Sequence, residues 1–272
     1  MKLSKLFAVL SSVAVFSSAV AFSGNVYAAD DSVSTEGSSS MELVIGVLGE
    51  AFMEAHDDIS FTYNPTGSGA GINAVAEGRC DIGLSSRNLT DAEKQNLNGD
   101  VVAIDGIVVV VNPQNPVKNL SLAQIKDIYT GKVTNWSAVG GEDHPIVLIG
   151  REAGSGTRDG FESVTDTSDQ CKYRQELTST GDVITTVAQN VNAVGYASLS
   201  ALSEKVHAVT VDGISATEDT IRDGSYKLQR PFLLVTPKDK PLEGAAKTFM
   251  DFAMSPEQAH FVEGAGVVPM AK

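Results

Sequence analysis

The chain has few of the residues from which most enzyme and metal sites are built. Its 272 residues include 2 cysteines and 4 histidines, and aromatic side chains make up 6% of it. The histidines lie far apart and lack the spacing of metal ligands: His56, His144, His207 and His260. We therefore expect no metal and no cofactor. The single tryptophan, Trp136, is expected to serve packing.

Basic residues are outnumbered by acidic ones. There are 20 lysines and arginines against 34 aspartates and glutamates, which gives a formal net charge of −14. Such a charge argues against nucleic acid and against anionic membrane surfaces as partners. It also means that any anion site must depend on local hydrogen-bond donors acting against an unfavourable overall field.

Long apolar runs are absent after the first residues. Lys2 and Lys5 precede an apolar segment, 6–22, and a small-residue cleavage pattern, 26–28, so residues 1–28 are predicted to be a signal peptide. The protein is expected in the periplasm or outside the cell, without a lipid-anchor cysteine. Later on, the longest apolar run, 107–111, has the length of a strand. Cys80 and Cys171 can form one disulfide in an oxidising compartment, although the sequence does not show that they meet.

Strand-like and helix-like segments alternate along the chain, which is typical of α/β proteins with mostly parallel sheets. The predicted strands are 32–36, 59–63, 80–84, 101–112, 146–149, 193–197, 206–211 and 231–236. Helices are predicted at 41–56, 72–76, 121–129, 159–164 and 242–252, with others beginning near Thr180 and Ser255, and a short one behind the Thr90 to Glu93 capping box.

Four turns rich in serine and glycine follow predicted strands. The most distinctive is 150–158, where Arg151 precedes Ser155, Gly156 and Thr157 at the start of a helix. Free N–H groups and the helix dipole favour an anion at such a place, and a guanidinium suits a tetrahedral oxyanion. The others are 38–41, 66–70 and 85–87. Ligands of open α/β sheets bind beyond the carboxyl ends of strands, so the four turns can converge on one anion.

Enzyme motifs are incomplete at the same places. Ser155 has Ala153 where a nucleophile elbow needs glycine, and no histidine follows at the spacing of a base. The 67–69 turn lacks the third glycine of a dinucleotide loop, and 150–157 lacks the lysine of a P-loop. A binding protein is therefore favoured. A secreted phosphatase or hydrolase that uses Ser155 stays as the enzyme alternative.

The order of motifs along the chain resembles that of the periplasmic phosphate-binding proteins that feed the ABC-type phosphate importer. The motifs that carry this resemblance are the four turns and the segments 80–87, 194–196 and 226–231. The resemblance implies a two-lobe class II periplasmic-binding-protein fold. Each lobe would be a mostly parallel sheet flanked by helices, with the ligand cleft between the lobes. Lobe I would comprise 29–104 and 230–272, and lobe II 105–229, so that the chain crosses the hinge twice.

The resemblance also implies a function and a set of ligand contacts. A monomer would bind inorganic phosphate, without its water, and deliver it to the membrane permease of an ABC phosphate importer. Arg151 would supply the only formal charge. By position, the phosphate-binding residues would be Ser40, Met41, Ser68, Gly69, Ser86, Arg151, Ser155, Gly156 and Thr157.

The chain departs from that family at Ser86, where well-known members carry an aspartate that accepts a hydrogen bond from the ligand. Sulfate cannot donate such a bond, so an acceptor separates it from phosphate. A backbone carbonyl, Ser86 itself or Asp159 could take this role. Otherwise the ligand could be another oxyanion, such as sulfate, molybdate or arsenate. Arg87 is either a second ligand donor or, as we favour, a salt-bridge partner for the other lobe.

Overall fold

The computed structural model describes residues 32–270; the predicted signal peptide, 1–28, lies outside them. The long helices are α1 (Glu42–Ala55), α2 (Ser68–Ala76), α4 (Leu122–Tyr129), α5 (Gly156–Thr165), α6 (Thr180–Ala188) and α8 (Gly244–Ala253). Shorter ones are α3 (Glu93–Asn96), α7 (Glu218–Arg222), α9 (Ala259–Gly264) and the 3₁₀ turns Ser39–Met41, Trp136–Val139, Leu199–Ala201 and Pro256–Gln258. No helix within 32–270 is long and apolar enough to cross a membrane.

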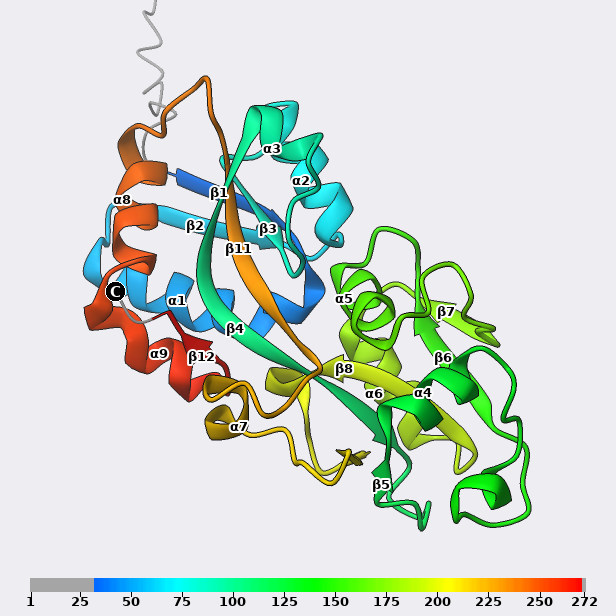
Figure 1. The fold of residues 1–272 in the computed structure, drawn as a ribbon. Helices are drawn as coiled ribbons and strands as arrows, with labels where there is room; N and C mark the ends of the chain where they lie inside the picture. Colours follow the sequence, from blue (N-terminus) through cyan, green and yellow to red (C-terminus); the bar gives the residue numbers. More distant parts are fainter. Residues whose placement is uncertain (1–31, 271–272) are drawn as a thin grey trace, which may run out of the picture.

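Ten strands form one curled, mixed sheet (Figure 1). Its main path is β2 (Ser60–Asn64), β1 (Ser32–Gly37), β3 (Ile82–Ser85), β11 (Gln229–Pro237), β4 (Leu97–Val111), β8 (Ala193–Ser198), β6 (Val147–Arg151) and β7 (Gln175–Leu177). β9 (His207–Ala208) and β12 (Val268–Pro269) add to β4, while β5 (Asn119–Leu120) and β10 (Thr210–Val211) pair separately. Neighbouring strands pair in parallel at both ends of this path, from β2 to β3 and from β8 to β7. In the middle, the pairs β3–β11, β11–β4 and β4–β8 are antiparallel.

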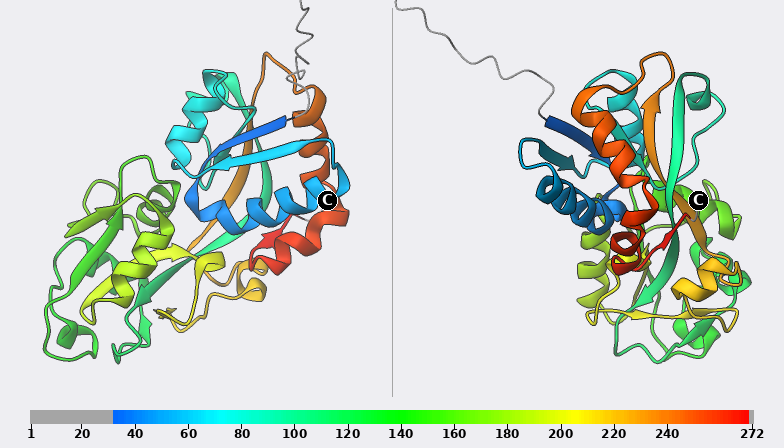
Figure 2. Two further views of the ribbon diagram at one scale, coloured as in Figure 1. Left: turned by 180° about the vertical axis from the view of Figure 1, so that it is seen from behind. Right: turned by 90° about the vertical axis from the view of Figure 1, so that its left-hand side faces the viewer.

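β4 belongs to both halves of the molecule. Its first part pairs with β11 and its second part with β8. Figures 1 and 2 show two bodies: β4 and β11 run side by side in one of them, and the second part of β4 continues into the other. We call the body around β1, β2, β3, α1, α2 and α8 lobe I, and the body around β6, β7, β8, α4, α5 and α6 lobe II. The expected α/β fold is confirmed.

Alternating side chains on the shared strands build a core on each face of the sheet. Phe232 and Leu234 of β11 pack with α1 and α8, while Leu233 packs with α2 on the opposite face. In lobe II, Val109 of β4 joins the cluster that contains α4 and α5, and Val110 joins the cluster of α6. The sheet is therefore covered by helices on both faces, which leaves the strand ends as the place for a ligand.

Two predicted elements differ from the structure. The strand expected at 206–211 is divided into β9 and β10, because its halves pair with different partners, β4 and β5. The strand expected at 101–112 begins earlier, at Leu97, since β11 extends the pairing as far as Pro237.

The cysteines and the tryptophan are also placed. Cys80 lies before β3 in lobe I and Cys171 lies beyond α5 in lobe II, and both are free thiols, so the disulfide left open by the sequence does not form. Trp136 is buried, and its indole N–H donates to the carbonyl of Asn192 at 3.0 Å. Its expected packing role is confirmed.

Candidate functional site

Three loops of lobe I meet at the carboxyl ends of β1 and β3. These strands are parallel neighbours, so the residues that follow them emerge at the same edge. The Ser38 hydroxyl donates to Ser86 Oγ at 2.7 Å, and the Ser86 backbone N–H donates to Ser68 Oγ at 3.0 Å. Gly67, with φ of 95°, makes the turn into α2 that a side chain would strain. All three serines are buried.

Lobe II contributes the end of β6 and the start of α5, as the sequence predicts. Ser155 caps α5, and its Oγ accepts the N–H of Arg158 at 3.4 Å. Gly156 and Thr157 occupy the first helical positions, where backbone N–H groups have no partner within the helix. This end of α5 therefore presents donors and a positive dipole toward lobe I.

The two halves touch across the cleft. Ser40 Oγ lies 3.3 Å from Thr157 Oγ1, and the Gly69 N–H donates to the Gly154 carbonyl at 2.9 Å. A Cβ added to Gly156 would lie 2.4 Å from Ser68 Oγ and 2.6 Å from Ser86 Oγ. The structure brings the predicted residues of both lobes together, in a closed arrangement. Met41 has its side chain in the lobe I core, and its N–H donates to the Ser38 carbonyl at 3.0 Å.

Arg151 spans the boundary between the lobes and is only 1% exposed. Its guanidinium donates to the carbonyls of Leu177 and Thr178, to Thr180 Oγ1 and to Ser39 Oγ of lobe I, at 2.8 to 3.2 Å. These bonds use four of its five N–H donors. Burial lowers the pKa of Arg151, yet an arginine of this kind keeps its charge. No carboxylate pairs with it among the described residues, so its charge remains available to an anion.

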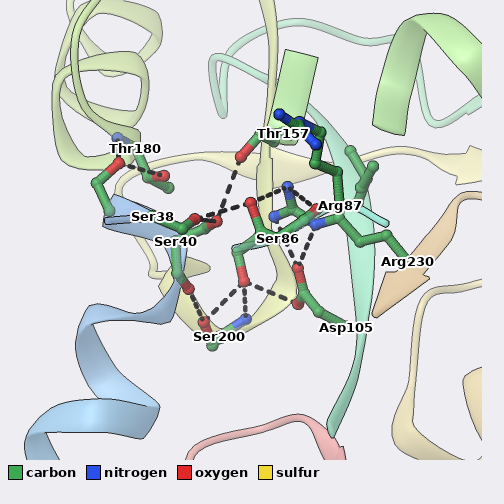
Figure 3. Close-up of polar contacts among 12 residues, drawn as sticks. Ser38, Ser40, Ser86, Arg87, Asp105, Thr157, Thr180, Ser200 and Arg230 are labelled. Carbon is green, nitrogen blue, oxygen red and sulfur yellow. Dashed lines mark hydrogen bonds and ion pairs between the residues drawn. The ribbon is translucent and has the colours of Figure 1, made fainter. Parts of the chain in front are cut away.

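A second guanidinium also reaches the site, which corrects the expectation that Arg151 supplies the only formal charge. Arg230 Nη1 donates to Ser86 Oγ at 3.1 Å, while its Nε and Nη2 donate to Asp105 Oδ2 at 3.1 and 2.9 Å. Figure 3 shows this pair beside Ser86 and the serines of lobe I. Arg230 lies in the segment 226–231, which is part of the family resemblance, but the resemblance assigned no role to Arg230. Asp105, the one charged residue within the predicted strand 101–112, was the available signal.

Arg87 makes a salt bridge between the lobes, as favoured from the sequence. Its Nε lies 3.0 Å from Asp159 Oδ2 of α5, and both terminal nitrogens donate to Glu93 at 2.8 Å. The Arg87 guanidinium lowers the pKa of Glu93 to about 2. Burial raises the pKa of Asp159, and Arg87 opposes that shift. Asp159, one of the acceptors considered above, therefore directs its carboxylate to Arg87.

The fold and the divided, donor-rich site define a two-lobed ligand-binding protein. A family model of the PBP superfamily domain matches residues 26–257. The phosphate-binding protein PstS of Bacillus subtilis is 32% identical over 251 residues, which cover 89% of this chain and 82% of that protein. PstS of Borreliella burgdorferi is 26% identical over 86% of this chain and 88% of that protein.

Solved structures agree with these relatives. A phosphate ABC transporter substrate-binding protein of Clostridium perfringens, with bound phosphate, is 40% identical with a TM-score of 0.85, over 88% of this chain and 100% of that one. An ABC-type phosphate transport receptor of Vibrio cholerae is 34% identical with a TM-score of 0.73, over 88% and 100%. The chain belongs to the PstS family of phosphate-binding proteins, within the PBP superfamily. It is a binding protein rather than an enzyme.

Proposed function

We propose that the protein binds inorganic phosphate between its lobes, outside the cytoplasm, and delivers it as a monomer to the membrane permease of an ABC importer. The observation that carries the proposal is the buried set of donors from both lobes around Arg151. The Clostridium perfringens relative, 40% identical, was solved with phosphate bound. We place the lobe boundaries at 104/105 and 229/230; the pairing of Asp105 with Arg230 near the end of the β4–β11 ladder supports this division.

The contacts that we propose for phosphate are those expected from the sequence: Ser40, Met41, Ser68, Gly69, Ser86, Arg151, Ser155, Gly156 and Thr157. A phosphate that loses its water must regain many hydrogen bonds, because each missing one in a closed cleft costs about 1 to 3 kcal/mol. Hydroxyls and N–H groups from both lobes can supply them only when the lobes are closed; the N–H groups of Met41 and Gly69 would then exchange the Ser38 and Gly154 carbonyls for phosphate oxygens. Ligand binding therefore selects the closed state, which a permease can distinguish from the open one.

Calorimetry on protein stripped of ligand in denaturant and refolded tests the proposal. Wild-type protein should bind phosphate, and Arg151→Ala should bind it about 10- to 150-fold more weakly, because one N–H donor remains and a charge-assisted hydrogen bond is worth about 1.5 to 3 kcal/mol. The surface variant Arg222→Ala is the matched control, since Arg222 pairs with Glu263 away from the cleft. Equal phosphate affinity in wild-type protein and Arg151→Ala would refute the assignment of Arg151.

A second candidate ligand is another tetrahedral oxyanion, favoured by the serine at position 86. Thermal-shift measurements with phosphate, sulfate, molybdate and arsenate compare the candidates directly, because a ligand that binds only the folded state raises the unfolding temperature. The largest shift with phosphate at equal concentration would support the first candidate.

A further inference from the structure

Asp105 and Arg230 form an ion pair that is out of contact with solvent. Their side chains are 0% and 2% exposed, and the two guanidinium bonds to Asp105 Oδ2 are 2.9 and 3.1 Å long. The second carboxylate oxygen, Oδ1, accepts the Ser198 hydroxyl at 2.7 Å, from the end of β8. The guanidinium carbon also lies 5.4 Å from the ring centre of Phe232. Arg230 is thus held by the carboxylate and the aromatic ring, while Ser198 holds the carboxylate in place.

Such a pair is a poor device for stability alone. Removing two charges from water costs about as much as their attraction returns, and well-packed apolar residues often do as well. The pair is placed so that the carboxylate holds the far side of the guanidinium, while Nη1 points to Ser86 Oγ at 3.1 Å. Its positive end is therefore directed at the binding site.

The hydrogen bonds around Ser86 leave its hydroxyl one role. A serine oxygen has two lone pairs and one hydrogen. Ser86 Oγ accepts one hydrogen from Ser38 at 2.7 Å and another from Arg230. Both lone pairs are then occupied, so the Ser86 hydroxyl can act only as a donor, either to Ser68 Oγ at 3.2 Å or to a ligand.

The Ser86 hydroxyl lies at the place where an anion is expected. It is 3.2 Å from Ser68 Oγ, and both hydroxyls face the first residue of α5, Gly156. Ser68 Oγ already accepts the Ser86 N–H. When the Ser86 hydroxyl donates to Ser68 Oγ, both lone pairs of Ser68 are occupied and the Ser68 hydrogen is the one left for a ligand. With either serine as the last donor, this side of the cleft presents a hydroxyl hydrogen and no free lone pair of Ser86.

We propose that Arg230, held by Asp105, is a positioning residue that makes Ser86 a hydrogen-bond donor and so directs the cleft to deprotonated oxyanion oxygens. This inference rests on the proposed function. A carboxylate at position 86 would reject sulfate, because sulfate has no hydrogen to donate to it. A hydroxyl that donates at this position can bond to an oxygen of sulfate or of phosphate equally well. The protein should therefore bind doubly charged phosphate in preference to the singly charged form, and should tolerate sulfate.

Competition calorimetry with inorganic phosphate and sulfate tests the role of the pair. In the double variant Asp105→Asn/Arg230→Met, Ser86 regains a free lone pair, and the ratio of sulfate to phosphate dissociation constants should rise about tenfold or more. Arg230→Lys, which keeps a cationic donor, should stay near the wild-type ratio, and so should the control Arg222→Gln. If the double variant weakens both anions by the same factor, the pair is merely structural and the inference is overturned.

Wild-type protein provides a test that does not depend on folding of a variant. Calorimetry below neutral pH, in buffers of different ionisation enthalpy, counts the protons exchanged on phosphate binding. A cleft that takes the doubly charged form should release nearly one proton per phosphate bound, and none per sulfate. Phosphate binding without proton release would overturn the inference. Wild-type protein that binds neither anion would instead refute the proposed function, which is a distinguishable result.

Discussion

Two guanidinium groups reach the binding cleft, and each is held by a different kind of partner. Arg230 faces a carboxylate, whereas Arg151 faces carbonyls and hydroxyls only. Closing the lobes without a ligand would bury the charge of Arg151 uncompensated, which is costly in a low-dielectric interior. An anion removes that cost. Arg151 therefore makes closure depend on ligand, even though the net charge of −14 repels anions at a distance.

Glu93 should make stability depend on pH on the acid side. Its pKa falls from 4.5 to about 2 on folding, because Arg87 donates to its carboxylate. The unfolded chain then binds the proton more readily, so the stabilisation is complete above about pH 4.5 and is lost as the pH falls toward 2. Urea unfolding of wild-type protein and Glu93→Gln across this range measures it. The variant should show a shallower decline; parallel curves would contradict the assignment.

At the scale of elements, the first turn of α5 fits against lobe I without room for a side chain. A Cβ at Gly156 would lie within 2.6 Å of hydroxyls on both Ser68 and Ser86. We predict that Gly156→Ala weakens phosphate binding about tenfold or more, because it holds the lobes apart. The fold should be retained, since alanine has a higher helix propensity than glycine.

The matched control for that variant is Gly46→Ala in α1, where an added Cβ meets no atom within 4 Å. Calorimetry and circular dichroism on both variants separate closure from folding. Gly46→Ala should bind phosphate like wild-type protein. Unchanged binding in Gly156→Ala would mean that the lobes close differently around the ligand.

Most helices and strands were predictable from the sequence, because the residue pattern of each segment matches the burial and turn geometry that the segment has in the fold. The serine and glycine turns are such a case: α2 begins after Gly67, whose positive φ suits glycine, and α5 begins at the cap Ser155, and both residue types are visible in the chain. The division of 206–211 into β9 and β10 was not visible, because it depends on which distant strands each half meets.

The same limit applies to the site. Residues in the turns could be found from the sequence, since each turn carries its own signal. The contact between Arg230 and Asp105 joins positions 125 apart, and neither neighbourhood indicates the other. Only the cost of burying Asp105, the one charged residue between 101 and 112, pointed to a hidden partner. Partner identity is set by the antiparallel register of β4 and β11, in which Arg230 lies directly opposite Asp105.

At the scale of the whole molecule, Arg87 and Asp159 connect the lobes beside the cleft. The pair is partly exposed, with Asp159 at 42%, so its contribution to closure should be about 1 kcal/mol or less. Arg87→Gln and Asp159→Asn should each weaken phosphate binding by about two- to fivefold, mostly through faster dissociation.

Stopped-flow dissociation measurements on the two single variants and the double variant test this pair. If the salt bridge holds the closed state, the double variant should lose little more than either single variant. The effect should also shrink at high salt, because partly exposed charges are screened. Fully additive losses would show that Arg87 and Asp159 act separately.

The path of β4 and β11 has a consequence for the order in which the molecule is made. Lobe I combines β1 to β3 with β11 and α8, so its core includes Phe232 and Phe249. Synthesis begins at the amino end, so the first segments of lobe I wait for residues made more than a hundred positions later. Pairing across such a separation is slow. Lobe II, proposed above as 105–229, is contiguous in the sequence and can assemble earlier. The anion site, completed by Arg230, is thus among the last parts to form.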